Sequence, residues 1–388
     1  MPHNSADALV VGGGPGGLFV AERLARAGVG TIVCEEHATV GDPVHCTGIL
    51  AAESFDEFDL PRDAILNTLT TARFVSPSGI AIRYTTPTPL AAVIDRPAFD
   101  RSLALRAAHA GAEIRTGVRV STLDVDRSGV RATAGDRTIR ARLAILACGA
   151  NYALQRRLGL GLPKVYLHTA QRELAAERLL DVELHFGRRV APQGFAWAVP
   201  VARPDGLRVR VGIMADRDAV SGYARMVERV RDRWGIDGRS APPRQKILPL
   251  GAIDRTVGDA VIAIGDAAGL VKPTTGGGIY YSILSAALAA DVAIDALRAN
   301  RLDAATLSAY ERAWRHQLDA ELEAQHALRK VASFLSDDAI DCLFDLAQTD
   351  GIMPIVRSTA RFNRHRELIW ALFKHPPSRR ILLRSVMG

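Results

Sequence analysis

The 388-residue chain is long enough for one large domain or two medium ones, and a hydrophobic fraction of 48% excludes a disordered protein. The net charge is +7, but the arginines are scattered among acidic residues, so we expect a mixed-charge surface and no nucleic-acid partner. The four cysteines (Cys34, Cys46, Cys148 and Cys342) form no CxxC pair and have no histidine at metal-ligand spacing, which favours a reducing compartment and no metal site.

No basic segment precedes the first apolar run, and no uncharged apolar stretch reaches about 18 residues. We therefore expect a cytoplasmic protein that is at most peripheral to a membrane.

The first 35 residues predict a dinucleotide-binding unit. A short apolar run at 8–11 has the length of a strand, a glycine loop follows at 12–17, and a helical pattern continues from 18 to 27. A second apolar run, at 31–34, ends at Glu35. Strand, turn, helix, strand and terminal acid together are far more specific than a glycine pattern alone.

The glycines and the acid of such a unit each have a physical purpose. Gly12 permits the tight turn, Gly14 lets backbone N–H groups approach a pyrophosphate, and Gly17 allows the helix to pack closely on the strand. Glu35 can accept hydrogen bonds from ribose hydroxyl groups. The nucleotide-binding residues predicted here are Gly12, Gly14, Pro15, Gly16, Gly17 and Glu35.

Further elements of the same domain are expected later in the chain. Residues 96–110 predict a helix that begins at Arg96, a further candidate for cofactor binding, and strands are expected at 143–147 and 261–264. We assign residues 1–70, 91–150 and 255–300 to a Rossmann-type nucleotide-binding domain.

The intervening segments have a different character. Residues 73–86 alternate around a Ser-Pro-Ser-Gly turn like a hairpin, and 181–214 contains several short β-like runs. We assign 71–90 and 151–254 to an inserted antiparallel β-sheet domain that binds substrate, and 301–388 to a C-terminal helical region. The expected fold class is α/β, or α+β overall.

A second motif carries a family resemblance. Gly265-Asp266-Ala267-Ala268-Gly269, Pro273 and Gly276–Ile279 resemble the second FAD motif of the p-hydroxybenzoate-hydroxylase-like flavoproteins. The resemblance implies that FAD is the cofactor, that Asp266 binds its ribityl chain, and that the helix after the glycines points its N-terminus at the flavin. Its cofactor-binding residues would be Gly265, Asp266, Gly277, Gly278 and Ile279.

Within that superfamily the chain resembles the geranylgeranyl reductase family. The similarity rests on Pro43–Gly48, on Phe195–Pro200 and on the glycine run at 276–279. The family's aromatic-x-Trp-x-Phe-Pro signature is matched at Phe195, Trp197 and Pro200, and the chain departs from it at Val199. The resemblance covers about residues 7–315.

The resemblance implies saturation of carbon–carbon double bonds in an isoprenoid chain by hydride transfer from reduced flavin. Trp197 and Phe195 would line an apolar substrate pocket, although an aromatic pair in a strand is also common in a plain core. Cys46, aided by His45, would donate a proton or position the substrate, or else Cys46 is simply a small buried hydrophobe. Either Tyr280 or Tyr281 would face the flavin. No second Rossmann fingerprint is present that could hold a nicotinamide cofactor permanently. The expected reductant is therefore NAD(P)H that binds transiently or a ferredoxin-like protein.

Three other functions share part of this pattern. Aromatic hydroxylases of this superfamily usually carry an Asp-Gly pair where this chain has Cys148-Gly149, which makes a monooxygenase less favoured. A halogenase is disfavoured because Phe195 replaces a tryptophan of its motif and no lysine precedes Lys164. A non-catalytic prenyl-binding escort protein would have no chemical need for both Glu35 and Asp266.

The tail mixes large apolar residues with basic ones over 365–384. Such a mixture suits an anionic membrane surface, but it also suits a helix that packs on the body with a solvated basic face. We expect at most weak, salt-sensitive membrane binding.

Overall fold

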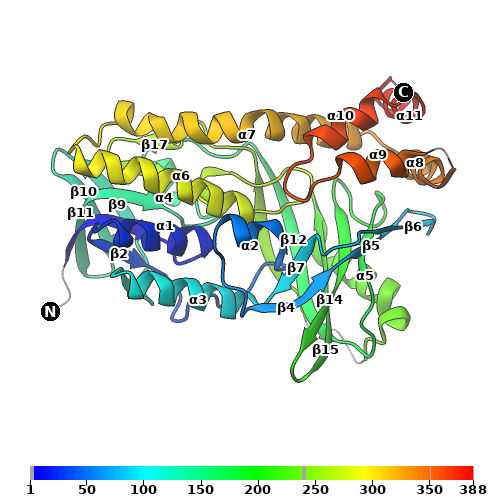
Figure 1. Cartoon of the computed structure of the whole chain (residues 1–388), viewed down its shortest axis with the longest axis horizontal. Helices are drawn as coiled ribbons and strands as arrows, with labels where there is room; N and C mark the ends of the chain where they lie inside the picture. Colours follow the sequence, from blue (N-terminus) through cyan, green and yellow to red (C-terminus); the bar gives the residue numbers. More distant parts are fainter. Residues whose placement is uncertain (1–3, 238–241, 350, 388) are drawn as a thin grey trace.

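The computed structural model describes residues 4–237, 242–349 and 351–387, and it confirms a mixed α/β fold. Figure 1 shows an elongated molecule in which the N-terminal strands and helices occupy one end, while the second sheet and the last helices occupy the other. The long helix α7 (Ala304–Ala332) runs along one side from the first end toward the second.

The first sheet has eight strands in the order β17-β18-β11-β1-β2-β8, with β10 paired to β11 and β9 paired to β10. Strand β1 lies in the middle and is parallel to both β2 and β11. Residues 8–11 are fully buried, as expected for a parallel strand that is covered on both faces. The strands are β1 (Ser5–Val11), β2 (Thr31–Cys34), β8 (Glu113–Arg115), β9 (Thr122–Asp126), β10 (Gly129–Ala134), β11 (Arg137–Leu146), β17 (Val257–Gly258) and β18 (Val261–Ala263).

Three helices pack together beside this sheet. Helix α1 (Pro15–Arg26) contacts both α3 (Arg96–His109) and α6 (Ile279–Arg298), and α6 also contacts α7. By length and hydropathy alone α6 could cross a membrane, but 56% of its apolar window is buried inside the protein. The contacts with α1 and α7 identify α6 as a core helix of this domain.

The second sheet has seven strands in the order β16-β12-β15-β14-β13-β5-β6. The hairpin expected near residue 76 is its β5–β6 edge. The segment 181–214 differs from the expected short runs, because it contains two long paired strands of nine and ten residues. The strands are β5 (Thr71–Val75), β6 (Ala81–Thr85), β12 (Val165–Ala175), β13 (Val182–His185), β14 (Phe195–Arg203), β15 (Gly206–Ala215) and β16 (Arg244–Leu250).

A helix lies inside the segment that we had assigned to strands. Helix α5 (Ala219–Trp234) buries Tyr223, Met226 and Val230 against the second sheet. Their spacing of three and four residues is that of one helical face. The sequence contained this period, but the surrounding β-like runs obscured it.

A small third sheet lies between the two larger ones. Its strands β3 (Ile49–Ala51), β4 (Ile65–Leu69) and β7 (Ala91–Ile94) come from segments that we had assigned to the nucleotide-binding domain. Val93 of β7 shares a core cluster with Trp197 and Val199 of the second sheet. The third sheet thus joins the two domains into one body.

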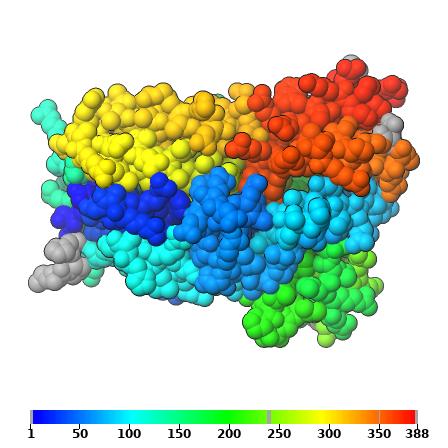
Figure 2. Space-filling view, in the orientation of Figure 1, coloured from blue at the N-terminus to red at the C-terminus, as the bar shows by residue number. Residues whose placement is uncertain are grey.

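Short helices complete the molecule. Two lie within the first domain and its connections, and four follow α7 at the C-terminal end. They are α2 (Glu53–Glu57), α4 (Ala153–Arg157), α8 (Asp337–Thr349), α9 (Ile352–Thr359), α10 (Arg366–Lys374) and α11 (Pro376–Met387), with a 3-10 turn η1 at Gly265–Ala268. Figure 2 shows α8 to α11 as a compact cap over the second-sheet end.

Candidate functional site

The glycine loop after β1 divides into glycines that the protein needs and one that it does not. Gly12 has φ +112°, and a Cβ on it would lie 2.3 Å from the Ala147 carbonyl oxygen. A Cβ on Gly17 would lie 2.1 Å from the Gly12 carbonyl oxygen. Gly14 instead has φ −80°, and no described protein atom lies within 4 Å of its Cβ position. No contact among the described residues therefore requires a glycine at position 14, and the missing side chain leaves room for a ligand.

Glu35 follows β2 and lies next to this loop. Its Oε2 accepts a hydrogen bond of 2.7 Å from the Gly13 N–H, and its Oε1 accepts one of 2.9 Å from the His37 N–H. The His37 Nδ1 also lies 2.5 Å from Oε1, and a carboxylate has about four lone-pair sites, which is one more than these three contacts use. Glu35 thus fixes the loop and keeps capacity for ribose hydroxyl groups.

The second motif meets the first at two helix N-termini. Ser282 in the first turn of α6 lies against Gly16 and Gly265, where an added Cβ would approach its Oγ to 2.3 and 2.4 Å. Asp266 lies beside Gly278, whose Cβ would come within 2.7 Å of Asp266 Oδ1. The N-terminus of α1 has no side-chain cap, and neither does that of α6. The Asp266 carboxylate also pairs with Lys246 at 3.9 Å. Two uncapped helix N-termini and this carboxylate suit the pyrophosphate and ribityl chain of FAD.

These elements open into a large cavity of about 690 Å³. One part of its wall comes from the nucleotide-binding domain, including Gly14, Asp266 and Gly278. The rest comes from the second and third sheets and from the C-terminal helices, and most of these residues are apolar. A mostly apolar cavity adjoining the FAD motifs suits a hydrophobic substrate.

Trp197 and Phe195 both line this cavity. Their rings are 5.8 Å apart in an edge-to-face arrangement. The Trp197 indole lies flat over Gly212, its partner on β15, where any Cβ would come within 2.4 Å of the ring. Trp197 is 8% exposed, and its buried Nε1 has no hydrogen-bond partner among the described residues. The glycine opposite it therefore sets the position of the wall.

The loop at 43–48 brings His45 and Cys46 to the same cavity. Burial and the positive charges of Lys246 and Arg244 lower the pKa of His45, so it is neutral near pH 7. Cys46 Sγ accepts a hydrogen bond from the Gly48 N–H at 3.3 Å and lies close to Arg96.

Arg96 also lines the cavity, but its guanidinium is already paired with Asp100 through bonds of 3.1 and 2.7 Å. Burial disfavours the charge of Arg96, yet Asp100 and Cys46 outweigh this effect and raise its pKa. The guanidinium of Arg96 is thus engaged within the protein, and its contact with the cofactor stays a prediction.

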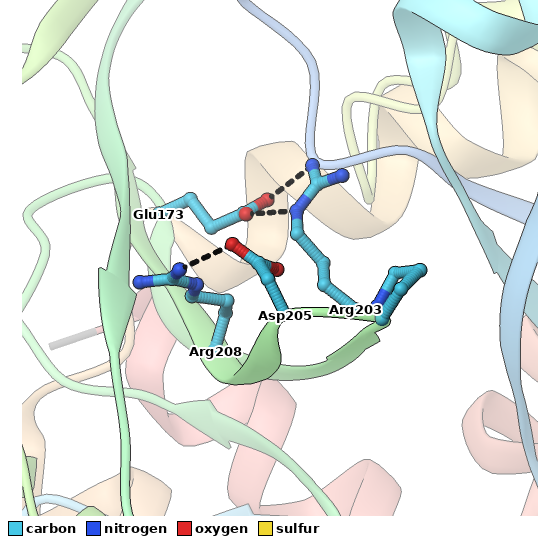
Figure 3. A pocket seen from close by; sticks show the side chains of 5 residues that line it. Glu173, Arg203, Asp205 and Arg208 are labelled. Atoms are coloured by element: carbon cyan, nitrogen blue, oxygen red, sulfur yellow. Dashed lines mark hydrogen bonds and ion pairs between the residues drawn. The ribbon is translucent and has the colours of Figure 1, made fainter.

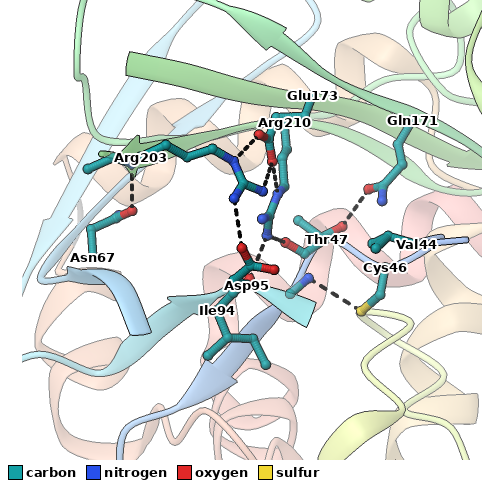
Figure 4. Close-up of polar contacts among 12 residues, drawn as sticks. Val44, Cys46, Thr47, Asn67, Ile94, Asp95, Gln171, Glu173, Arg203 and Arg210 are labelled. Atoms are coloured by element: carbon teal, nitrogen blue, oxygen red, sulfur yellow. Dashed lines mark hydrogen bonds and ion pairs between the residues drawn. The ribbon is translucent and has the colours of Figure 1, made fainter. Parts of the chain in front are cut away.

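An ion-pair network of the second sheet holds the 43–48 loop in place (Figure 4). Arg210 Nη1 donates to the carbonyl oxygens of Thr47 at 2.6 Å and Ile94 at 3.0 Å, while its Nε donates to Glu173 at 2.9 Å. Gly48 has φ +72°, and a Cβ there would lie 2.6 Å from Arg210 Nη1. The buried arginine therefore requires a glycine beside it.

The network continues outward to the tip of the β14–β15 hairpin. Arg203 bridges Glu173 and Asp95, and a small surface pocket near the hairpin tip contains a separate pair between Arg208 and Asp205 (Figure 3). This pocket lies away from the glycine loops, and the charges in it are matched. We assign it a structural role.

The two tyrosines after the glycine run have different surroundings. Tyr281 is fully buried away from the cavity and accepts a hydrogen bond from Gln325. Tyr280 lines the cavity, but its hydroxyl group donates to Glu57 at 3.0 Å. Burial and Glu57 raise the pKa of Tyr280, which keeps its proton in place.

The sequence reasoning missed two parts of the wall. One is Lys272, which lies between the two glycine stretches of the second motif. The other is the segment 360–372, whose Asn363, Ile369 and Leu372 all line the cavity. The chain has only five lysines, so a lysine inside a flavin motif could have been predicted to take part in the site. The sequence around 360–372 contains no pattern that predicts a place in the cavity wall.

Comparison with known proteins identifies the family. The chain is 30% identical over 360 residues to the digeranylgeranylglycerophospholipid reductase of Methanocaldococcus jannaschii, covering 87% of this chain and 89% of the other. It is 32% identical over 356 residues to digeranylgeranylglycerophospholipid reductase 2 of Methanothermobacter thermautotrophicus, covering 87% and 90%. This chain belongs to the geranylgeranyl reductase family. A family model described as lycopene cyclase protein also matches residues 7–337.

Solved structures agree on the fold of this reductase-family chain. A geranylgeranyl bacteriochlorophyll reductase-like protein from Thermoplasma acidophilum superposes with a TM-score of 0.83 at 23% identity, over 98% of this chain and 99% of that one. The halogenase PltM in complex with phloroglucinol and FAD gives 0.68 at 15% identity, over 95% and 86%. The glycine geometry, the family and this shared fold agree that the chain is an FAD-binding protein.

Proposed function

We propose that this protein is an FAD-dependent reductase that saturates carbon–carbon double bonds in a geranylgeranyl-type isoprenoid chain. The observation that carries the proposal is the mostly apolar cavity that adjoins both FAD motifs. The names of the relatives, which describe reductases of geranylgeranyl lipids, support the same substrate class.

One group of residues would bind the cofactor, and another would bind the substrate. The α1 N-terminus with Gly14 would receive the pyrophosphate, Glu35 the ribose, and Asp266 the ribityl chain. FAD supplies a hydride when it is bound and reduced. Trp197 and Phe195 orient an apolar chain and keep water out of the cavity, because an isolated alkene offers no charged group to grip.

A single-turnover experiment tests this function. Chemically reduced protein is mixed without oxygen with geranylgeranyl diphosphate or with a geranylgeranyl glycerol ether phospholipid. We expect flavin reoxidation and a product heavier by two hydrogens for each event. A requirement for oxygen, with addition of an oxygen atom, would show a hydroxylase instead.

Trp197→Ala tests the placement of the substrate. Near-attack geometry is sensitive to small displacements, so we expect turnover per bound flavin to fall roughly hundredfold. FAD content should change little, because Trp197 contacts β15 and not the glycine loops. Loss of flavin with normal turnover per remaining flavin would show that Trp197 is only structural core.

The electron donor in this proposal is NAD(P)H that binds transiently or a ferredoxin-like protein. Anaerobic mixing of the oxidised protein with NADH, NADPH or reduced ferredoxin distinguishes them by the rate at which the flavin absorbance bleaches.

We further propose a weak peripheral membrane contact through 365–384. The structure divides this segment, because Ile369 and Leu382 are buried while Trp370 and Leu383 are 51% and 49% exposed. Deleting the tail would remove cavity wall, so the sharper variant is Trp370→Ser with Leu383→Ser. We expect weaker, salt-sensitive sedimentation with phosphatidylglycerol vesicles than for the parent protein. Equal sedimentation of the two proteins would end the proposal.

A further inference from the structure

Lys272 is a buried cation that the site described above does not use. Its side chain is 2% exposed and contributes to the wall of the cavity. Lys272 lies three residues after Gly269 of the FAD motif, and its Cδ lies 3.4 Å from the Cβ position of Gly277, just before α6. Lys272 therefore lies between the cofactor motif and the cavity that would hold the substrate.

The amine is held from the opposite side by the C-terminal segment. Its Nζ donates to the Asn363 Oδ1 at 2.7 Å and to the Phe362 carbonyl oxygen at 3.0 Å. The rings of Tyr280, Tyr281 and Phe362 surround it with centroids 5.1–5.8 Å away. An ammonium has three donors, and these two oxygens account for two of them. Among the described residues no other oxygen accepts the third proton, and the neighbouring aromatic rings hold a proton far less strongly than an oxygen would.

The ionisable groups around Lys272 come from four elements. No carboxylate bonds directly to the amine among the described residues, because Glu53 reaches Asn363 and Glu321 reaches the backbone of residues 365 and 366. Burial lowers the pKa of Lys272 to about 7, and the more distant Glu321 and Glu53 only partly oppose this effect. The groups that face it are Glu53 of α2, Tyr280 and Tyr281 of α6, Glu321 of α7 and His365 of the C-terminal segment.

We propose that Lys272 is the acid that supplies the proton in alkene reduction. This inference rests on the proposed function. One carbon of the double bond gains a hydride from reduced FAD, the other gains a proton from the Lys272 ammonium, and the π bond is lost. Lys272 becomes a neutral amine and then takes a proton from water. Its desolvated environment favours this transfer, because the neutral amine is the form that an apolar cavity stabilises.

Other groups on the cavity wall are poorer acids. His45 is neutral near pH 7, and burial lowers the pKa of His365 to about 4, so neither carries a spare proton. Arg96 has a raised pKa and so releases its proton less readily, and the Tyr280 hydroxyl already donates its proton to Glu57. Two rivals remain on the cavity wall: Cys46, and Lys246, whose Nζ lies 3.9 Å from Asp266 Oδ2. The experiments below separate Cys46 from Lys272.

The first experiment measures the lysine without any turnover. The FAD-loaded protein is labelled with ¹³C-lysine, and the side-chain shifts are followed by NMR from pH 5.5 to 9. With five lysines in the chain the spectrum is simple enough to assign by substitution. We expect one signal set to titrate near pH 7 and to be missing from Lys272→Met, while exposed Lys330→Met removes a different set. A Lys272 signal that shows no titration in this range would overturn the inference.

The second experiment measures the proton step in anaerobic single turnover with geranylgeranyl diphosphate. The wild-type rate should be flat at low pH and fall about tenfold for each pH unit above the Lys272 pKa, because only the ammonium is the acid. Lys272→Arg keeps the charge but cannot release a proton, so the rate should drop roughly 10²–10⁴-fold and lose this pH dependence. Lys330→Met should behave as wild type.

The possible failures are distinguishable. If the wild type yields no product heavier by two hydrogens, the proposed function fails whatever Lys272 does. If the wild type reduces the alkene and Lys272→Arg retains both rate and pH dependence, only the role of Lys272 fails. Loss of that pH dependence in Cys46→Ser, with its retention in Lys272→Arg, assigns the proton to Cys46.

Discussion

The nucleotide-binding end and the substrate end of the molecule differ in how far apart along the chain their parts lie. At the first end, Gly12, Gly17 and Glu35 fall within one short strand–helix–strand unit. At the second end, the cavity wall joins Trp197 of β14, Lys272 of the motif loop and Leu372 of α10. Local geometry determines the first site, whereas only the complete fold assembles the second.

The largest expected effect separates two glycines of the first region. Gly17→Ala would place a methyl group 2.1 Å from the Gly12 carbonyl oxygen, so we expect a stability loss of about 3 kcal/mol, with loss of FAD. Gly14→Ala meets no described protein atom, so the melting temperature of the apoprotein should hardly change while FAD affinity falls about tenfold or more. Thermal unfolding and flavin content check both. Equal effects of the two variants on apoprotein stability would contradict this division.

This contrast explains what the sequence could predict. The first FAD motif could be recognised because its strand, glycine loop, helix and terminal acid all lie within 35 residues of the chain. The C-terminal wall could not, because Ile369 and Leu372 look like any amphipathic helix until α10 is placed over the cavity. The same lack of local information hid Arg210, whose role depends on Glu173, Thr47 and Ile94 in three separate segments. The role of Cys46 remains a prediction from the family resemblance.

We expect an intermediate loss of stability when the ion-pair network of the second sheet no longer holds the 43–48 loop. Arg210→Met would leave Glu173 without its buried partner and free the 43–48 loop. We expect a loss of about 2 kcal/mol, below the roughly 3–5 kcal/mol of fully buried pairs because the Glu173 side chain is 25% exposed. Alkylation of Cys46 by iodoacetamide should become faster.

Arg208→Met is the matched control for this variant. Among the residues that the structure describes, Arg208 pairs only with the exposed Asp205 at the hairpin tip, and such pairs contribute about 0–1 kcal/mol. Equal Cys46 reactivity in the two variants would show that the network does not position the loop.

The smallest effect is a difference between the two regions in acid. Burial alone would raise the pKa values of Asp95, Glu173 and Glu183, but hydrogen bonds and nearby positive charges lower all three below their ordinary values. Carboxylates with lowered pKa stabilise the fold above their unfolded pKa, and this stability is lost as the pH falls below about 5. Glu173 and Glu183 lie in the second sheet, and Asp95 is bridged to it by Arg203.

Hydrogen exchange at pH 4 and pH 7 tests this difference. Amides of β12 and β13 should lose protection at pH 4 before those of β1 and β11. Uniform loss across both sheets would mean that these carboxylates do not govern acid stability.

The interleaved order of the strands also bears on how the protein is made. The first sheet places β18 (Val261–Ala263) beside β11, and the cavity wall extends to Leu372. A ribosome releases the chain from its N-terminus, so the emerging polypeptide exposes the glycine loop long before the elements that enclose it have been synthesised. Such long-range pairings fold slowly and leave apolar surface open in the meantime. Early binding of FAD by the nascent chain would therefore have to occur on an incomplete domain, and the finished pocket forms only after the chain up to Leu372 has been synthesised.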